Sequence, residues 1–428
     1  MNYKIAIIGL GYVGLPLAIN FAKKYIVFGY DINQDRIKSL LNNEDQTKEA
    51  DLTSLQQVIV ANKNDIINSG LFLTNDVKDI EEANIYIVTV PTPVDNKKLP
   101  DLSKLLEASE TISHLLKKND IVIYESTVYP GCTEEECVPI LEKGSNLKYN
   151  LDFYCGYSPE RVSPGVNQLS FKEIVKVTSG SNPQVAKEID NLYSSIVPAG
   201  TYLAPSISIA EASKSIENAQ RDINISFMNE MALIFDKMNL DTHEVLKAAS
   251  TKWNFLPFYP GLVGGHCISV DPYYLAYKAK LLGYQPSVIL SGRSVNDKMG
   301  IFIADKVYNL LDNKFDNLKD LRVLILGITF KENCPDYRNT KVIDIYNRLK
   351  FLNLYVDIHD PVASKEEVFQ DLNIDLVENI FKKEYSAIIL AVSHNYYKNL
   401  DFNHFKKNGT IIYDVKNFID SSFVDGRL

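Results

Sequence analysis

The sequence predicts an α/β protein with two Rossmann-like domains joined by a helical middle domain. Short apolar runs alternate with helix-like segments near both ends of the chain, a pattern typical of doubly wound parallel sheets. The stretch between them has helical periodicity and lacks strand-like runs. We expect the domains to cover residues 1–200, 201–312 and 313–428.

The N-terminal part begins with an apolar run at residues 3–9, which we interpret as a buried strand that ends in glycine. Residues 12–24 have apolar side chains at helical spacing, and residues 26–30 form a second strand-like run. Further strands are expected at residues 84–90 and 120–124. This alternation predicts the first parallel sheet.

Helical patterns dominate the middle of the chain. They run over residues 207–249 and 272–311, on either side of an irregular segment rich in Gly and Pro at 256–272. Strand-like runs then return from Leu321, and they predict the second α/β domain. The expected strands after this point are Arg322–Gly327, Tyr355–His359, Ala387–Val392 and Thr410–Val415.

The composition bounds the class of protein. A chain of 428 residues with 46% hydrophobic and 23% charged residues is typical of soluble multidomain proteins. The formal net charge of -9 argues against nucleic acid as the main partner. Five scattered cysteines do not form a disulfide pattern, and neither a signal peptide nor a membrane span is apparent. We therefore expect a cytoplasmic protein with no metal site.

A glycine-rich turn follows the first strand. The segment Gly9-Leu10-Gly11-Tyr12-Val13-Gly14 fits G-x-G-x-x-G, and Asp31 ends the next strand. Gly9 permits a tight turn, Gly11 lets a pyrophosphate approach the helix N-terminus, and Gly14 permits close helix packing. The Asp31 carboxylate would accept hydrogen bonds from ribose hydroxyls and repel a 2′-phosphate. The pattern favours NAD, and the alternative is a glycine turn without a ligand.

Two further residues lie near this expected site. Arg36 is close enough to Asp31 in sequence to complicate the choice between NAD and NADP. Thr92, in Val90-Pro91-Thr92-Pro93, follows another strand at the sheet edge where ligands bind. Thr92 either contacts the cofactor or belongs to a rigid turn.

A cysteine follows two glycines in the segment Gly264-Gly265-His266-Cys267, with Asp271 four residues later. Adjacent glycines leave room for a ligand, and a cysteine presented in this way is a candidate nucleophile. The alternative is a buried structural cysteine. His266 is an unsuitable base for Cys267, since neighbouring side chains usually point apart. Cys132 and Cys137 lack a second matching pair, which argues against zinc.

Polar residues are spaced along one expected helix. Lys214 and Asn218 share a face at i and i+4, and Arg221 continues that side. This is either a solvated charged face or a pocket that stabilises an oxyanion. Glu160, just after a strand-like run, is a candidate general base.

Taken together, these motifs resemble the UDP-glucose/GDP-mannose dehydrogenase family over essentially the full chain. The shared landmarks occur in family order, from the glycine turn through Glu125-Ser-Thr-Val128, Ser158-Pro-Glu160, Glu211–Asn218, Gly264–Cys267 and Phe330-Lys331 to Arg338. The Ser158–Val162 and Gly264–Cys267 segments are similar to the branch that acts on UDP-N-acetylhexosamines. Pro164 departs from the UDP-glucose branch, which has an acidic residue there.

The resemblance implies a reaction: NAD-dependent, four-electron oxidation of the C6 hydroxyl of UDP-GlcNAc or UDP-GalNAc to the uronic acid, for bacterial surface polysaccharide. It implies Cys267 as nucleophile, Lys214 and Asn218 as stabilisers of oxyanions, Asp271 and Thr127 around the catalytic water, and Glu160 in thioester hydrolysis. It also implies a homodimer formed by the middle domain. The expected contacts with the cofactor are Gly9, Gly11, Tyr12, Val13, Gly14, Asp31, Arg36, Thr92, Thr127 and Arg338. Those expected with the UDP-sugar are Glu160, Arg161, Lys214, Asn218, Arg221, Gly264 and Lys331.

Two other functions are compatible with parts of the sequence. A two-electron β-hydroxyacid dehydrogenase shares the first domain and the helical lysine, but it needs neither the cysteine nor the second α/β domain. A non-catalytic regulator would bind NAD or a nucleotide sugar without turnover. The yield of NADH per substrate discriminates these functions.

Overall fold

The computed structural model describes residues 3–45, 47, 50–95, 97–161, 173–265 and 268–428. The chain divides into two compact units. The first comprises residues 1–217 and 273–283, and the second comprises residues 218–272 and 284–428. The long helix α7 (Ile207–Lys237) contributes residues to both units.

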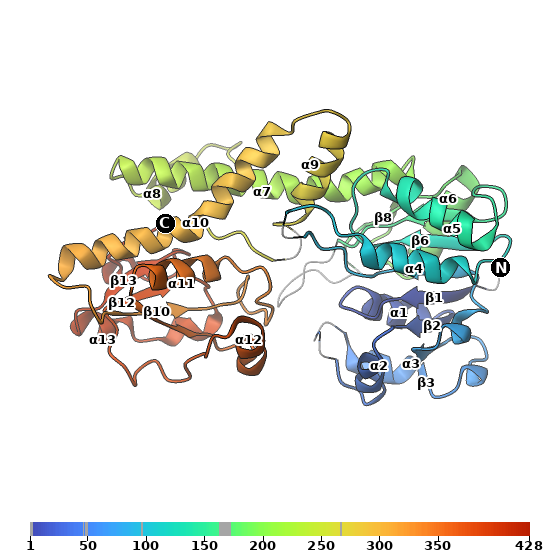
Figure 1. Cartoon of the computed structure of the whole chain (residues 1–428), viewed down its shortest axis with the longest axis horizontal. Coiled ribbons are helices and arrows are strands. Elements are labelled where there is room, and N and C mark those ends of the chain that lie inside the picture. Colours follow the sequence, from blue (N-terminus) through green and yellow to red (C-terminus); the bar gives the residue numbers. More distant parts are fainter. Residues whose placement is uncertain (1–2, 46, 48–49, 96, 162–172, 266–267) are drawn as a thin grey trace. The chain divides into compact units, whose positions relative to one another are not determined.

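The first unit contains a seven-stranded parallel sheet (Figure 1). Its strands are β1 (Lys4–Ile8), β2 (Ile26–Tyr30), β3 (Ile59–Val60), β4 (Gly70–Thr74), β5 (Ile85–Val88), β6 (Ile121–Tyr124) and β7 (Tyr154–Tyr157). The order is β3-β4-β2-β1-β5-β6-β7, so the chain changes direction across the sheet between β1 and β5. Ligands of such sheets bind at the carboxyl ends of the strands beside that change.

Helices and a small additional sheet complete this unit. The helices are α1 (Gly14–Ala22), α2 (Gln34–Leu41), α3 (Leu52–Val58), α4 (Ser103–Ser113), α5 (Val138–Ser145), α6 (Pro183–Ser194) and α9 (Asp271–Leu281), of which α9 begins in the second unit. The parallel strands β8 (Lys176–Thr178) and β9 (Thr201–Leu203) form the additional sheet.

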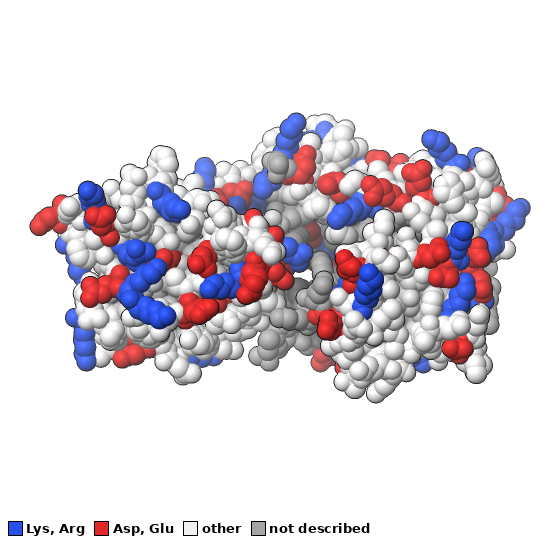
Figure 2. Space-filling view, turned by 60° about the horizontal axis from the view of Figure 1, so that its bottom comes forward, with Lys and Arg blue, Asp and Glu red and all other residues white. Residues whose placement is uncertain are grey.

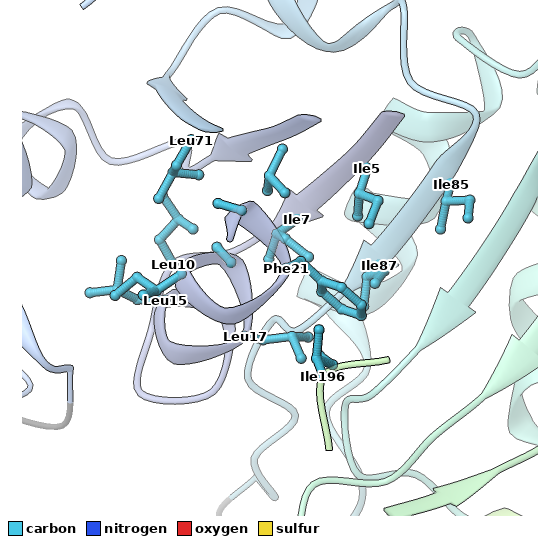
Figure 3. Close-up of a cluster of buried hydrophobic side chains, with 14 of the residues drawn as sticks. Ile5, Ile7, Leu10, Leu15, Leu17, Phe21, Leu71, Ile85, Ile87 and Ile196 are labelled. Carbon is cyan, nitrogen blue, oxygen red and sulfur yellow. The ribbon is translucent and has the colours of Figure 1, made fainter. Parts of the chain in front are cut away.

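The core of the first unit explains why residues 12–24 form a helix. Leu15, Leu17 and Phe21 of α1 belong to the same buried apolar cluster as Ile5 and Ile7 of β1. In Figure 3, Phe21 lies beside Ile7 and Ile87, and Leu17 lies beside Ile196. Burial of such side chains contributes about 1.5–3 kcal/mol each. This packing holds the N-terminus of α1 at the end of β1, where the glycine turn lies.

The second unit contains a five-stranded parallel sheet in the order β11-β10-β12-β13-β14. Its strands are β10 (Arg322–Leu326), β11 (Tyr355–His359), β12 (Ala387–Leu390), β13 (Ile411–Asp414) and β14 (Gly426–Arg427). Its helices are α8 (Thr242–Ala249), α10 (Ser287–Lys314), α11 (Val342–Phe351), α12 (Lys365–Leu372) and α13 (Phe402–Lys407), with most of α7.

Both faces of this second sheet are buried. Val323 and Ile325 lie in one apolar cluster with residues of α10 and α11, whereas Leu324 and Leu326 lie in another with residues of α13. Successive side chains of a strand point to opposite faces, so near-continuous apolar runs are the sequence signature of such a sheet. The predicted fold class of two Rossmann-like sheets and a helical middle is confirmed.

One sequence-based expectation needs correction. The helical pattern over 272–311 is not one stretch, because α9 and α10 are separate helices. Gly283 lies between them with a φ of +78°, a left-handed conformation that ends helices and that glycine adopts without strain. Within the described residues, no helix is long and apolar enough to cross a membrane.

Candidate active site

The three glycines of the turn after β1 have different surroundings. Gly9 has a φ of +96°, and its amide donates to the carbonyl of Tyr30 at 2.8 Å. A Cβ on Gly14 would lie 1.9 Å from the Gly9 oxygen and 2.4 Å from the Thr89 hydroxyl, so only glycine fits there. A Cβ on Gly11 would meet no atom within 4 Å. Gly11 therefore faces open space at the helix N-terminus, where a pyrophosphate fits.

Asp31 lies at the carboxyl end of β2 and is held by backbone donors. Its two carboxylate oxygens accept from the amides of Leu10 and Asn33, each at 2.9 Å. A carboxylate oxygen can accept more than one hydrogen bond, so these contacts leave capacity for ribose hydroxyls. The carboxylate is partly exposed, and its orientation is set by the glycine turn itself.

Arg36 is buried against the same turn. Its Nε donates to the carbonyl of Leu10 at 2.9 Å, and its guanidinium pairs with Asp45 at 2.8 Å. These contacts connect α2 to the glycine turn. The structure thus places Arg36 at the predicted cofactor site with protein partners on its guanidinium.

The loops after β5 and β6 are joined at the carboxyl edge of the sheet. The Thr92 hydroxyl donates to the carbonyl of Thr127 at 2.6 Å, and the Ser126 hydroxyl donates to the carbonyl of Val90 at 2.6 Å. The buried Tyr274 of α9 donates to the carbonyl of Thr92 at 2.9 Å. Thr92 and Thr127, predicted from separate motifs, therefore lie together beside the expected cofactor site.

A buried ion pair that was not predicted from the sequence supports the loop that carries Glu160. Lys176 pairs with Glu125 at 2.6 Å and donates to the carbonyl of Pro159 at 3.0 Å. Tyr193 also donates to Glu125. Burial raises the pKa of Glu125, and the adjacent Lys176 ammonium opposes that shift. The pair fixes the backbone directly before Glu160.

Arg161 extends this loop toward α7. Its guanidinium pairs with Glu217 at 2.8 Å and donates to the carbonyl of Val175 at 2.8 Å, and its amide donates to Glu160 at 2.7 Å. Residues 162–172, among them Pro164, lie outside the described residues. The hydrogen bond from the Arg161 amide places the predicted substrate residues Glu160 and Arg161 in contact with each other.

The first turns of α7 are anchored to the loop after β6. Glu211 is fully buried and accepts from the amides of Gly131 and Thr133, at 2.5 and 2.9 Å. Burial raises the pKa of Glu211 to about 7. Lys214, three residues later on the same helix, is also buried. A solvated charged face would leave these side chains exposed, so the burial of Lys214 argues against that alternative.

Within the second unit, Asn218 of α7 contacts Asp271. The Asn218 amide nitrogen donates to the Asp271 carboxylate at 2.6 Å, and both side chains are buried. The two residues come from motifs that are far apart in sequence. Arg221, three residues further along α7, is exposed.

A buried polar chain anchors the segment that leads to Cys267. Arg293 pairs with Asp222 at 2.6 Å, and Asn296 donates to the same carboxylate at 2.7 Å. Asn229 donates to Asn296 at 2.7 Å and exchanges two backbone hydrogen bonds with Gly261, at 3.0 and 2.8 Å. The start of the glycine loop is thereby fixed to α7 and α10.

The paired glycines pack against the loop that follows β10. A Cβ on Gly264 would lie 2.7 Å from the Asn339 oxygen, and a Cβ on Gly265 would lie 2.8 Å from the Phe330 ring. Gly265 has a φ of +86°, which also favours glycine. His266 and Cys267 lie outside the described residues. Gly265, which directly precedes them in the sequence, lies beside Phe330, the neighbour of Lys331.

Lys331 and Arg338 belong to that loop. The Thr329 hydroxyl donates to the carbonyl of Lys331 at 2.9 Å. Arg338 is exposed and makes a bidentate contact with Asp336, at 2.9 and 2.8 Å. The loop leaves the carboxyl end of β10, next to the point where the order of the second sheet reverses, which is the usual place for a ligand.

The other cysteines and the charged side chains bear on which groups can act as nucleophile or metal ligand. Cys132, Cys137, Cys155 and Cys334 are free and buried, and burial raises the pKa of the Cys155 thiol well above its usual range. None of these four thiols is presented to a substrate. Within the described ranges, no cluster of His, Cys, Asp or Glu is arranged to hold a metal ion. On the face in Figure 2, basic and acidic side chains are interspersed.

Comparison with known families finds three successive matches along the chain. Residues 3–197 match the NAD binding domain of the UDP-glucose/GDP-mannose dehydrogenase family. Residues 208–298 match the central domain of that family, and residues 324–421 match its UDP binding domain. These matches include both glycine turns described above and the helical segment that carries Lys214.

Curated relatives match over their whole length. The chain is 50% identical to a UDP-N-acetyl-D-glucosamine 6-dehydrogenase from Pseudomonas aeruginosa, covering 100% of both chains. It is 49% identical to the enzyme of the same name from Salmonella typhi, covering 99% of this chain and 98% of the relative. Among solved structures, a UDP-D-ManNAc dehydrogenase from Pyrococcus horikoshii superimposes with a TM-score of 0.85 at 31% identity, covering 99% of this chain and 98% of that one.

Proposed function

Since the chain belongs to the UDP-glucose/GDP-mannose dehydrogenase family, we propose that it oxidises the C6 hydroxyl of UDP-N-acetyl-D-glucosamine to a carboxylate, with NAD as electron acceptor. The observation that carries this proposal is the 50% identity, without truncation of either chain, to a UDP-N-acetyl-D-glucosamine 6-dehydrogenase. Three relatives named UDP-N-acetyl-D-mannosamine dehydrogenase are 30–32% identical. The product serves the synthesis of a bacterial surface polysaccharide in the cytoplasm.

The turn after β1 fits NAD. Gly11 leaves the helix N-terminus accessible to a pyrophosphate, and Asp31 is oriented by the turn to accept from the adenosine ribose. Tyr12, Val13, Arg36, Thr92, Thr127 and Arg338 complete the proposed set of cofactor contacts. A four-electron oxidation releases two hydrides, and two NAD molecules bound there in succession would each accept one.

Cys267 supplies the covalent step. Its thiolate adds to the C6 aldehyde left by the first oxidation and forms a thiohemiacetal, which the second oxidation converts to a thioester. Water then breaks the carbon–sulfur bond, which releases the carboxylate and restores the thiol. Covalent capture keeps the aldehyde on the enzyme and divides one difficult reaction into easier steps.

The buried polar residues of the site stabilise the oxygen charges of these steps. The Lys214 ammonium and the Asn218 amide stabilise the C6 oxyanion, because a preorganised donor in a dry site acts more strongly than water does. Asp271, held by Asn218, and Thr127 orient the hydrolytic water, and Glu160 assists thioester hydrolysis. Arg161, Arg221, Gly264 and Lys331 contact the UDP-sugar.

We also propose that the chain forms a homodimer. In the second unit, Trp253, Leu256 and Tyr259 are exposed, with 92% of Trp253 accessible, and so are Phe227 and Met238 of α7. Exposed large apolar and aromatic side chains are enriched in protein–protein interfaces. A second copy of the chain covers these side chains, and light scattering of wild type and Trp253→Glu tests the assignment. A monomeric wild type would contradict it.

The substrate is tested by comparing kcat/KM for UDP-N-acetylglucosamine, its galactosamine and mannosamine epimers, and UDP-glucose, each with NAD and with NADP. We expect UDP-N-acetylglucosamine and NAD to give the highest value. A higher value with the mannosamine epimer or with UDP-glucose would overturn the substrate, and activity confined to NADP would overturn the role of Asp31.

A further inference from the structure

A buried histidine in the second unit contacts both ends of the segment that carries Lys331. His394 follows β12 and is fully buried. Its Nδ1 accepts from the amide of Asn333 at 2.9 Å, and its Nε2 lies 3.1 Å from the Thr329 hydroxyl and 3.1 Å from Asp360. The five residues 329–333 are thus fixed at their first and last positions.

The hydrogen bonds specify one tautomer. Since a backbone N–H can only donate, Nδ1 of His394 must accept from Asn333, and the proton of a neutral ring lies on Nε2. That proton points to Asp360 and Thr329. The Thr329 hydroxyl in turn donates to the carbonyl of Lys331 at 2.9 Å. An unbroken chain of donors and acceptors therefore runs from His394 to the backbone of Lys331.

Asp360 is the acceptor at the other end of this series of hydrogen bonds. It accepts from the amides of Ile328 and Thr329, at 2.7 and 3.2 Å. Burial works against its charge, but the hydrogen bonds from His394 and from the backbone outweigh burial and lower the pKa of Asp360 to about 2. The Asp360 carboxylate therefore remains ionised, and both of its oxygens can accept hydrogen bonds.

The same local geometry occurs at the NAD turn, with one difference. Gly327 has a φ of +93° and donates to the carbonyl of His359 at 2.8 Å, as Gly9 does to Tyr30. The amide of Ile328 donates to Asp360, as the amide of Leu10 does to Asp31. Asp31, however, is partly exposed, whereas the Asp360 side chain has no exposed surface. A ribose hydroxyl cannot reach Asp360, so this carboxylate acts within the protein.

We propose that Thr329, His394 and Asp360 are positioning residues, which hold the 329–333 segment so that Lys331 meets the negatively charged nucleotide part of the substrate. The proposal rests on the proposed function, because it takes a UDP-sugar as the ligand of the second sheet. In this proposal the buried Asp360–His394 pair increases the affinity for the substrate, whereas Asp31, the corresponding carboxylate of the first sheet, binds the cofactor directly.

Thr329→Val and Thr410→Val form a matched pair of variants. Both threonines are buried, and each hydroxyl donates to one backbone carbonyl, Thr329 to Lys331 at 2.9 Å and Thr410 to Tyr385 at 2.8 Å. Valine keeps the shape and removes the hydroxyl. We expect Thr329→Val, which also loses the contact with His394, to lose at least as much thermal stability as Thr410→Val. Thr329→Val alone should raise the calorimetric Kd for UDP, by about fivefold, the factor of one ordinary hydrogen bond.

Steady-state kinetics separate positioning from general damage. Thr329→Val should raise KM for the UDP-sugar about fivefold with KM for NAD and kcat unchanged. Two replacements of His394 divide its contacts. In His394→Asn, Oδ1 takes the place of Nδ1 and preserves the bond from Asn333. In His394→Gln, the amide nitrogen takes the place of Nε2 and preserves the bond to Thr329. Both should raise KM for the UDP-sugar.

Equal affinity of Thr329→Val and Thr410→Val for UDP would overturn the positioning role while leaving the proposed function intact. His394 variants that lose stability with wild-type KM would also overturn it. A wild-type enzyme that does not bind UDP at all would overturn both proposals.

Discussion

The glycine turn after β1 provides a matched pair of substitutions with opposite expected effects. A Cβ on Gly14 would lie 1.9 Å from a backbone oxygen, about 1 Å inside the 3.0 Å that real Cβ atoms keep. It would also lie 2.4 Å from the Thr89 hydroxyl, which donates to the Gly9 carbonyl at 2.7 Å. Gly14→Ala must therefore displace α1 from β1 or break that bond. A Cβ on Gly11 meets nothing within 4 Å.

The cost of Gly14→Ala follows from these contacts. Overpacking costs about 1–3 kcal/mol, and the lost hydrogen bond costs about 1 kcal/mol. The better helix propensity of alanine offsets about 1 kcal/mol. The net loss is about 2 kcal/mol, which lowers Tm by about 4–8 °C in a domain of this size.

Gly11→Ala should leave Tm unchanged and weaken NAD binding more than tenfold, because its methyl group takes the space that a pyrophosphate needs. Differential scanning fluorimetry and NAD titration by calorimetry measure both quantities on each variant. A Gly14→Ala protein that melts like wild type would refute the packing argument. A Gly11→Ala protein with unchanged affinity for NAD would refute the assigned pyrophosphate position.

Three further predictions concern buried charge and the nucleophile. Because the pKa of Glu211 rises from 4.5 unfolded to about 7 folded, its stabilising contribution is complete below 4.5 and declines as pH rises through about 7. Between about pH 5 and about pH 8, the free energy of unfolding should decline by about 3 kcal/mol less in Glu211→Gln than in wild type, as measured by urea unfolding. Arg293→Met leaves the buried Asp222 unpaired and should lower the free energy of unfolding by about 3–5 kcal/mol, measured in urea. Cys267→Ala should form no uronic acid, measured by mass spectrometry of the products.

Each of these has a contradicting result. If wild type and Glu211→Gln change in stability equally between the two pH values, Glu211 does not titrate as described. A small effect of Arg293→Met, equal to that of Asp297→Asn at the exposed end of the same guanidinium, would show that the Asp222 pair is not essential. Uronic acid from Cys267→Ala at the wild-type rate would exclude the thioester.

Local patterns were sufficient to predict most of the fold. The run from Tyr355 to His359 is a strand with those bounds, and residues 26–30 form β2 as expected. The second succeeds because a buried parallel strand requires a near-continuous apolar run, which is visible locally. The first is an edge strand with Asp357 at its centre, and its β-branched residues Val356 and Ile358 gave the signal. The separate roles of Gly9 and Gly14 were also predictable, since a motif fixes their spacing from the strand. The break at Gly283 also had a local signal, a glycine followed by Pro286, but the apolar periodicity on both sides of it led us to expect one helical stretch.

The supporting contacts of the site were not predictable from the sequence. Glu125 and Lys176 pair across 51 positions, and His394 bonds to Asn333 across 61. Such contacts depend on which segments the fold brings together, and a single sequence does not record that arrangement. An ionisable residue inside an apolar strand region, as Lys176 is, was the available signal. A buried charge requires a partner, so such a residue predicts an ion pair without identifying it.

A four-electron oxidation of one carbon yields two NADH, and the yield of NADH from a limiting amount of UDP-N-acetylglucosamine measures this stoichiometry. With excess NAD and enough enzyme to complete the reaction, we expect two NADH for each sugar nucleotide consumed, with the uronic acid as product. A yield of one NADH, with the aldehyde as product, would show a two-electron oxidation and remove the role assigned to Cys267.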